Sequence, residues 1–194
     1  MNKFKSLLKK KDGILTTAEA NAVGISNERL RLLVKDGTLE RVAYGIYASH
    51  DVLLDKMYIL QKQRPKLIYS HETALFLHNL TDRDPINYSV TVPSGHNNKN
   101  IRKDGLRIFY IKPEFYKKDI VTMETIFGHK VSVYGLERTI CDSIRSRNQM
   151  DIAVVTQALK EYSKRKDKNL GLLMDIAGEF EITKILRGYM EVLL

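Results

Sequence analysis

The sequence predicts an α+β protein with a small helical N-terminal part, which ends in two short β segments, and a mixed α/β part whose C-terminal portion is helical. Two observations predict this class. Apolar residues recur at helical spacing through residues 2–35, and helical spacing returns from residue 135 to the end. Between these regions, apolar and polar residues alternate in several short segments, as is typical of half-buried strands.

Length and composition limit the class of protein. With 194 residues we expect two domains, at residues 1–48 and 49–194, and the 43% of hydrophobic residues exclude a disordered chain. The single cysteine, Cys141, excludes an internal disulfide and fits a reducing cytoplasm. Because no apolar run reaches about 18 residues and the N-terminus lacks a signal peptide's apolar core, we expect a cytoplasmic protein without a membrane span.

The charge is basic and concentrated near the N-terminus. The chain has 32 basic and 23 acidic residues, a net charge of +9. Residues 1–50 hold nine Lys and Arg against five Asp and Glu, and a second basic concentration lies at residues 99–118. Such a balance favours polyanionic partners, although charged runs also occur on ordinary solvated surfaces.

The first fifty residues predict three helices followed by a β pair. The first helix covers about residues 2–11. The pair Thr16 and Glu19 has the capping-box spacing for a second helix, and Gly24 supplies a turn that requires positive φ. Ser26 caps a third helix, which Asp36-Gly37 ends, and two β segments follow around the turn Ala43-Tyr44-Gly45. This order predicts a winged helix-turn-helix.

In that fold the second helix of the pair enters the DNA major groove. Asn27 and Arg29 near its start suit two-bond contacts with adenine and guanine, while hydroxyls of the segment suit phosphate. The predicted DNA-binding residues are Thr17, Ser26, Asn27, Arg29, Arg31, Lys35 and, on the wing, Arg41 and Tyr44. The alternative is a three-helix unit that uses the same fold for protein contacts.

The remaining residues predict strands and then helices. The predicted helices are at 51–63 and 71–79, the strands at 67–69, 88–92 and 106–111, with one or two more within 119–134. Helices continue from residue 135, interrupted near 147–150 and 166–169.

Motifs for catalysis, metal binding and cofactor binding are missing from the sequence. His71 and His78 share one predicted helix but lie two turns apart, and no His-Glu-x-x-His is present, so we interpret His71 as a surface residue near a helix cap. Ser94-Gly95-His96 lacks a surrounding Gly-x-Ser-x-Gly, and there is no Gly-x-x-x-x-Gly-Lys loop. We therefore predict no catalytic residues, no metal and no cofactor.

Two groups in the second part allow two interpretations each. Glu137 and Arg138 either begin a salt-bridged helix, with Arg138 and Asp142 at i, i+4, or form an antitoxicity surface. The basic stretch with Arg102, Lys103 and Arg107 would join that surface. Strand alternation puts Phe109 beside Arg107, where it either stacks on nucleic acid or packs under the C-terminal helices. Cys141 is predicted to be a small core residue.

Several segments resemble one protein family. They are Gly13-Ile14-Leu15-Thr16-Thr17, Gly24-Ile25-Ser26, Leu39 to Tyr47, Ile68 to Leu75 and Tyr134 to Asp142. Together they resemble the AbiEi-type antitoxins, the transcriptional regulators of bacterial abortive-infection toxin–antitoxin systems that act in phage defence. The resemblance implies a protein that represses its own operon at inverted repeats in duplex DNA. It also implies that the protein counteracts a nucleotidyltransferase toxin without a stable complex.

Two other functions compete with this one. The chain could be an enzyme acting on nucleic acid or nucleotides, with the N-terminal part serving for delivery. It could also be a transcriptional regulator that senses a ligand in its second part and has no antitoxin role. The absence of catalytic motifs favours the non-enzymatic interpretation.

Overall fold

The computed structural model describes residues 2–95 and 105–193, in two units. The N-terminal unit contains residues 1–66 and 124–131, and the C-terminal unit contains residues 67–123 and 132–194. Residues 49–66 therefore group with the first unit and not with the second. Whether residues 1–48 form an independent domain stays a prediction.

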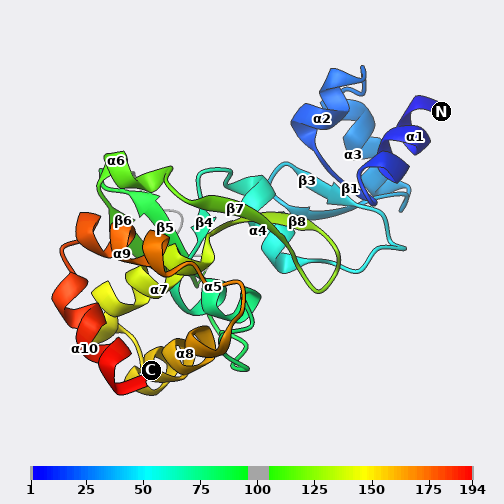
Figure 1. The fold of residues 1–194 in the computed structure, drawn as a ribbon. Coiled ribbons are helices and arrows are strands. Elements are labelled where there is room, and N and C mark those ends of the chain that lie inside the picture. The colour runs from blue at the N-terminus through cyan, green and yellow to red at the C-terminus, as the bar shows by residue number, and fades with distance from the viewer. Residues whose placement is uncertain (1, 96–104, 194) are drawn as a thin grey trace. The chain divides into compact units, whose positions relative to one another are not determined.

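The N-terminal unit is a winged helix-turn-helix followed by one further helix (Figure 1). Its elements are α1 (Asn2–Lys10), β1 (Ile14–Thr16), α2 (Thr17–Ala22), α3 (Asn27–Lys35), β2 (Glu40–Ala43), β3 (Ile46–Ala48) and α4 (Lys56–Gln63). The three strands form an antiparallel sheet in the order β1-β3-β2. The sequence did not predict β1 as a strand, and α4 begins five residues later than expected because Asp55 caps it.

The predicted helix caps of this unit are confirmed. Glu19 N donates to Thr16 Oγ1 at 3.1 Å, and Thr16 N donates to a Glu19 carboxylate oxygen at 2.8 Å, which completes the capping box. Ser26 accepts from Arg29 N at 3.1 Å, and Gly24 has φ +84°. These local bonds start α2 and α3 at fixed residues. The helices then bury Leu15, Ala20, Leu30, Leu33 and Leu39 in a small core.

A buried carboxylate attaches residues 124–131 to the rest of the N-terminal unit. Asp55, 1% exposed, accepts from Tyr58 N at 3.1 Å and so caps α4. It also accepts from the Thr125 hydroxyl, and His129 Nδ1 lies 3.0 Å from the same carboxylate. The His129 ring stacks on Tyr58 with ring centroids 4.4 Å apart. Residues distant in sequence thus satisfy one buried charge, as buried charges require.

The C-terminal unit contains a five-stranded mixed sheet in the order β6-β5-β4-β8-β7. Its strands are β4 (Ile68–Tyr69), β5 (Ser89–Pro93), β6 (Arg107–Ile111), β7 (Ile120–Glu124) and β8 (Lys130–Tyr134), of which β7 and β8 extend into residues 124–131. β4 pairs antiparallel with β5 and parallel with β8, and β5 pairs parallel with β6. The predicted strands are present, including two within residues 119–134.

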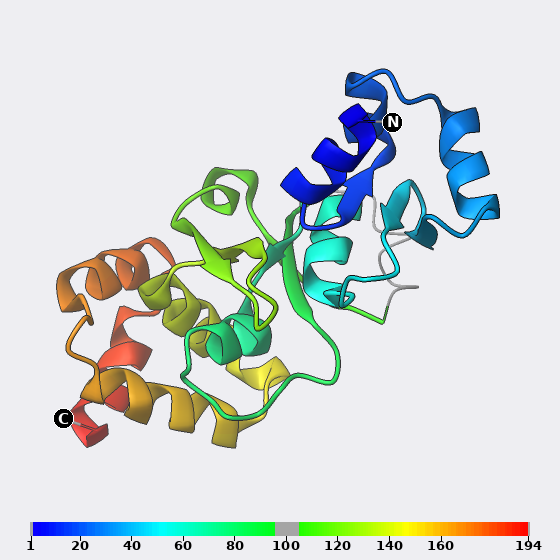
Figure 2. The same ribbon diagram turned by 90° about the vertical axis from the view of Figure 1, so that its right-hand side faces the viewer.

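Helices complete this unit. They are α5 (His71–Leu77), the short α6 (Pro113–Tyr116), α7 (Leu136–Arg145), the 3-10 turn η2 (Arg147–Gln149), α8 (Ile152–Lys164), α9 (Leu170–Glu179) and α10 (Thr183–Leu193). In Figures 1 and 2 the yellow-to-red helices α7–α10 gather together beside the sheet. Their apolar side chains form the largest core, with Leu75 of α5 and Ile111 of β6. The predicted breaks near 147–150 and 166–169 are confirmed, and α6 was not predicted.

Within residues 2–95 and 105–193, no helix combines the length and the apolar composition that crossing a membrane requires.

Candidate nucleic-acid interface

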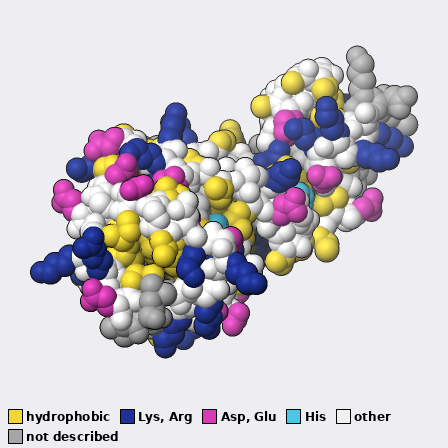
Figure 3. Space-filling model, in the orientation of Figure 1, with side chains coloured by type: hydrophobic (Ala, Val, Ile, Leu, Met, Phe, Trp, Pro, Cys, Tyr) yellow, Lys and Arg dark blue, Asp and Glu magenta, His cyan; other side chains and the backbone are white. Residues whose placement is uncertain are grey.

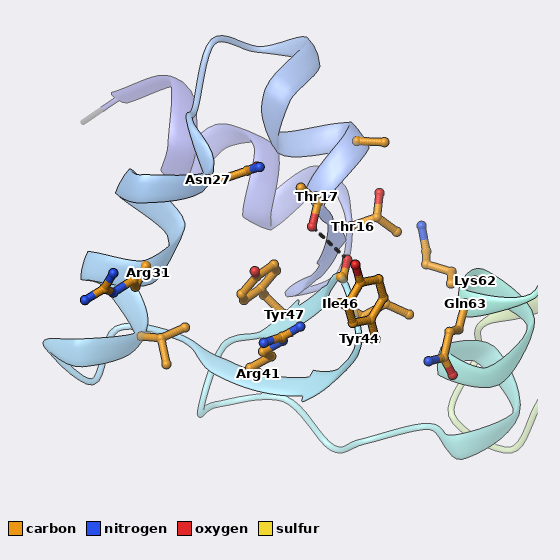
Figure 4. A pocket seen from close by; sticks show the side chains of 13 residues that line it. Thr16, Thr17, Asn27, Arg31, Arg41, Tyr44, Ile46, Tyr47, Lys62 and Gln63 are labelled. Atoms are coloured by element: carbon orange, nitrogen blue, oxygen red, sulfur yellow. Dashed lines mark hydrogen bonds between the residues drawn. The ribbon is translucent and has the colours of Figure 1, made fainter. Parts of the chain in front are cut away.

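A hollow of about 650 Å³ opens in the N-terminal unit between α3, the β2–β3 wing and α4 (Figure 4). Its lining combines cationic, amide, hydroxyl and aromatic side chains. The lining residues are Thr16, Thr17, Ala18, Asn27, Arg31, Val34, Arg41, Tyr44, Gly45, Ile46, Tyr47, Lys62 and Gln63. Five of the eight predicted DNA-binding residues therefore surround one concave surface.

Helix α3 divides its residues between the core and this hollow. Leu30 and Leu33 are buried in the core, whereas Asn27 and Arg31 are exposed and line the hollow one turn apart. An amide and a guanidinium at this spacing project from the same side of a helix. Together they offer the donor and acceptor patterns that read adenine and guanine edges.

The wing supplies a second cation and an exposed aromatic ring. Tyr44, at the turn, is 82% exposed, and the Arg41 guanidinium carbon lies 5.4 Å from its ring centroid. Gly45 has φ +71°, and its carbonyl oxygen accepts from Thr17 N at 2.8 Å and from the Thr17 hydroxyl at 3.3 Å. These bonds attach the wing turn to the start of α2. Thr17 is therefore a positioning residue in the free protein, although we predicted it as a phosphate contact.

The other three predicted residues do not line the hollow. The Ser26 hydroxyl caps α3 by accepting a hydrogen bond from Arg29 N. Arg29 follows Asn27 by two residues, which puts it about 200° around the helix at 3.6 residues per turn, on a different side. Lys35 is exposed at the last turn of α3. A DNA contact by any of these three stays a prediction.

Helix α4 contributes Lys62 and Gln63, which sequence reasoning missed. Lys62 Nζ and Lys11 Nζ each lie 2.8 Å from the same oxygen of Glu19. Burial alone would raise the pKa of Glu19, but bonds from Lys11, Lys62 and the Thr16 backbone outweigh it and lower that pKa to about 2. The carboxylate is thus charged and neutralised next to the hollow, and α4 is attached to α2.

Positive charge remains available around the hollow. Arg31 and Arg41 form no ion pair with an acidic side chain in the part of the chain that the structure describes. Figure 3 shows Lys and Arg side chains on both units, so positive charge alone does not distinguish this surface. The combination of free guanidinium groups with a helix face and a wing does distinguish it.

The predicted antitoxicity surface is only partly exposed. Arg102 and Lys103 lie outside the described residues. Arg107 is partly exposed, and its guanidinium forms an ion pair with Glu72, which also accepts from the Ser89 hydroxyl. Glu137 and Arg138 are buried, so their assignment to a surface was wrong.

Arg138 is held inside the C-terminal unit by several partners at once. Its Nε donates to Asp142 at 2.9 Å, and its Nη1 donates to the Phe115 carbonyl at 3.1 Å. The guanidinium carbon lies 4.2 Å from the Tyr134 ring centroid and 4.6 Å from that of Phe180. Glu137 accepts from the Asn169 backbone N–H at 2.8 Å. These contacts support the interpretation of a salt-bridged helix packed into the core.

The histidine predicted at the surface is also buried. His71 is fully buried, with φ +49°, and its ring stacks on Phe109 at a centroid distance of 3.4 Å. Its ring nitrogens lie 2.9 Å from the Ser70 hydroxyl and 3.0 Å from the Ser146 hydroxyl. The prediction failed because strand β6 covers this end of α5. Phe109 is therefore a packed residue and not an exposed stacking platform.

The single cysteine and the acidic and histidine side chains were the remaining candidates for catalysis or metal binding. Cys141 is buried as predicted, and burial raises the pKa of its thiol to about 12, which keeps it protonated. Among the described residues, no cluster of His, Cys, Asp and Glu side chains could hold a metal ion.

Comparisons with known proteins bear on the family of the N-terminal residues and on the fold. Residues 4–50 match the family described as "Transcriptional regulator, AbiEi antitoxin", a description of a regulator and not of an enzyme. The crystal structure of the RV2827C protein from Mycobacterium tuberculosis is similar, with a TM-score of 0.58 and 12% sequence identity over 88% of this chain and 69% of that chain. At this identity the similarity shows the fold alone. No curated protein matches the sequence.

Proposed function

Because residues 4–50 match the AbiEi antitoxin family of transcriptional regulators, we propose that this chain is a DNA-binding repressor of its own operon. We also propose that it is an antitoxin that counteracts a cognate nucleotidyltransferase toxin. Its direct partner is duplex DNA with inverted repeats, and the toxin is counteracted without a stable complex. The protein works in the cytoplasm and needs no cofactor.

The observation that supports DNA binding best is the arrangement around the hollow. Asn27 and Arg31 lie one turn apart on α3, Arg41 and Tyr44 lie on the wing beside it, and all four line the hollow. A recognition helix inserts into the major groove while a wing reaches the neighbouring backbone, so both elements act on one duplex.

Binding of the full chain to its own promoter tests this half of the proposal. We expect tight binding at about 50 mM salt that weakens strongly by about 200 mM, because phosphate contacts release counterions. The double variant Arg31→Ala, Arg41→Ala should bind at least tenfold more weakly. The matched control Lys164→Ala, Lys166→Ala removes the same charge from an exposed part of the C-terminal unit and should bind like the wild type. No binding at low salt would refute DNA recognition.

The antitoxin half rests on the family description and needs a separate experiment. The full chain and the Arg31→Ala, Arg41→Ala variant are expressed from a foreign promoter together with the product of the adjacent gene. If antitoxicity is independent of DNA binding, both should restore growth. If growth stays arrested with both proteins at equal expression, the antitoxin role is refuted and only the proposed repressor role remains.

A further inference from the structure

Helix α4 forms the wall of the hollow that lies opposite α3. Figure 4 shows Lys62 and Gln63 at the end of α4, Arg31 on α3 at the opposite side, and the wing between them. The family match ends at residue 50, whereas α4 comprises Lys56–Gln63. The family description therefore assigns no role to this helix, although its side chains line the same concave surface as the recognition helix and the wing.

The Lys62 ammonium group is held in place at the lining of the hollow. Its Nζ donates to a Glu19 carboxylate oxygen at 2.8 Å and lies 5.0 Å from the Tyr58 ring centroid. Burial alone would lower the pKa of Lys62, but bonds to Glu19 and Tyr58 outweigh it and raise that pKa, so the group is charged at neutral pH. A side chain that is already held by two neighbours loses little conformational freedom when it binds a ligand.

The charges around Glu19 leave positive charge on the side of the hollow. Lys11 and Lys62 approach the same Glu19 oxygen, while the other oxygen accepts from Thr16 N at 2.8 Å. One carboxylate thus faces two ammonium groups, and one positive charge is in excess. Lys11 lies outside the lining of the hollow, whereas Lys62 belongs to it. Because an ammonium group has three N–H donors, Lys62 can keep its bond to Glu19 and still donate to an anion in the hollow.

We propose that α4 is a third DNA-contacting element, in which Lys62 binds a backbone phosphate on the side of the wing away from α3. This inference rests on the proposed function, because it takes duplex DNA as the occupant of the hollow. A lysine ammonium group is a compact point charge, which suits a phosphate and does not read a base. The contact holds α3 in register on the duplex and strengthens binding to every sequence alike.

Three full-length variants separate a phosphate contact from a structural role of Lys62. Lys62→Gln removes the charge but keeps a long side chain that can still donate to Glu19. Lys11→Gln is the matched control, since it removes the same charge from the same Glu19 oxygen outside the hollow. Lys62→Arg keeps the charge. Thermal unfolding confirms that each variant is folded. A purely structural role of Lys62 predicts that the two glutamine variants behave alike.

The first measurement is the salt dependence of binding to the promoter duplex and to an unrelated duplex, between about 50 and about 200 mM salt. Lys62→Gln should reduce the slope of log affinity against log salt concentration by about 0.9, the value for one phosphate contact. It should weaken binding to both duplexes by about fivefold at about 100 mM salt. Lys62→Arg and Lys11→Gln should keep the wild-type slope.

The second measurement locates the contact on the DNA. Promoter duplexes are prepared with one uncharged methylphosphonate linkage at a time. With wild type and Lys11→Gln, a linkage on the side of the wing, beyond the bases that α3 contacts, should weaken binding by about fivefold. With Lys62→Gln the same linkage should weaken binding by less than about 1.5-fold, because the partner of that phosphate is already missing.

The outcomes of the two measurements distinguish this inference from the proposed function. A wild-type salt slope in Lys62→Gln would overturn the phosphate contact, as would an equal loss of slope in Lys11→Gln. It would also be overturned if every linkage kept its wild-type effect in Lys62→Gln. In each of these cases, promoter binding by the wild type leaves the proposed function intact. A wild type that binds neither duplex at low salt would refute the proposed function, and the contact by α4 with it.

Discussion

Helices α3 and α7 are similar in length and both carry acidic and basic residues, but they place these residues in opposite surroundings. Helix α3 buries only Leu30 and Leu33 and exposes its charges to solvent. Helix α7 buries every residue from Glu137 to Ile144. The same residue types therefore form a solvent-exposed charged surface in one unit and an internal ion-pair network in the other.

The difference follows from the number of neighbours of each helix. Helix α7 packs against α5, α8, α9 and α10, whereas α3 contributes Leu30 and Leu33 to a small core with residues of α1, β1 and α2 and exposes its other side. A charge on α7 must find partners inside the protein, and Asp142 accepts from both Arg138 and Arg145 at 2.9 Å. A charge on α3 keeps its hydration and stays available to a ligand.

The largest expected effect comes from Asp142→Ala. The substitution leaves the Arg138 guanidinium buried without its carboxylate, and we expect the free energy of unfolding to fall by about 3–5 kcal/mol. Urea unfolding followed by circular dichroism measures this change. Glu28→Ala is the matched control, because it removes a carboxylate from the first turn of α3 and should cost only about 0.5 kcal/mol. An equal decrease in the free energy of unfolding for the two variants would contradict the difference in burial between α3 and α7.

The next largest effect is acid sensitivity of the C-terminal unit through His71. Burial, together with the charges of Arg145, Arg107 and Arg138, lowers the pKa of His71 well below 6.5. The folded protein keeps this ring neutral while the unfolded chain binds a proton, so stability decreases as the pH falls below 6.5. The decrease amounts to about 1.4 kcal/mol per pH unit.

Comparing wild type with His71→Asn isolates this effect, because asparagine does not titrate and tolerates the positive φ. Urea midpoints at pH 7.5 and 5.5 should show a shallower pH dependence for the variant. Identical slopes would mean that His71 does not carry the acid sensitivity.

A smaller effect is expected for Glu19→Gln in the N-terminal unit. The pKa of Glu19 is lowered from 4.5 to about 2, so its stabilisation is complete above pH 4.5 and is lost as the pH falls toward 2. The carboxylate is partly exposed, and solvent screening reduces the loss at pH 7 to about 1 kcal/mol. Thermal unfolding at pH 7 and pH 2.5 should show a difference between wild type and variant that narrows in acid. A constant difference would argue against the ion pairs.

The smallest effects on stability are expected on the exposed side of α3. Arg29→Ala and Arg31→Ala should each change the free energy of unfolding by less than about 0.5 kcal/mol. Their DNA affinities should separate, since only Arg31 lines the hollow. We expect about a tenfold loss of promoter affinity for Arg31→Ala and less than about threefold for Arg29→Ala. The reverse order would show that DNA contacts the opposite flank of α3.

The winged helix-turn-helix was predictable because its signals are local. The capping box at Thr16 and Glu19, the turn at Gly24 and the cap at Ser26 each act within a few residues of the chain. Strand β1 was missed because three residues are too few to show alternation, and it is fixed by pairing with β3. Strands β7 and β8 were predicted only as one or two strands within residues 119–134. Their pairing depends on the hairpin that joins them, which the alternation of residues does not show.

The errors concern contacts between distant residues. Arg138 and His71 are hydrophilic in sequence, and only the packing of α7–α10 and β6 around them shows that they are buried. Lys62 and Gln63 reach the hollow because Glu19, 43 residues away from Lys62, attaches α4 to α2. The local sequence pattern indicates neither the burial of Arg138 and His71 nor the contact between α4 and α2.

Residues 124–131 return from the C-terminal half of the sequence to the N-terminal unit, where Thr125 and His129 contact buried Asp55. The N-terminal unit, for which we propose DNA binding, is therefore encoded in two separate stretches of the gene. A single recombination event at residue 66 would transfer α1–α4 without the partners of Asp55 and leave a buried charge in an unrelated background. Exchange of DNA specificity between related genes should accordingly succeed by replacing α3 and the wing alone, or by moving both stretches together.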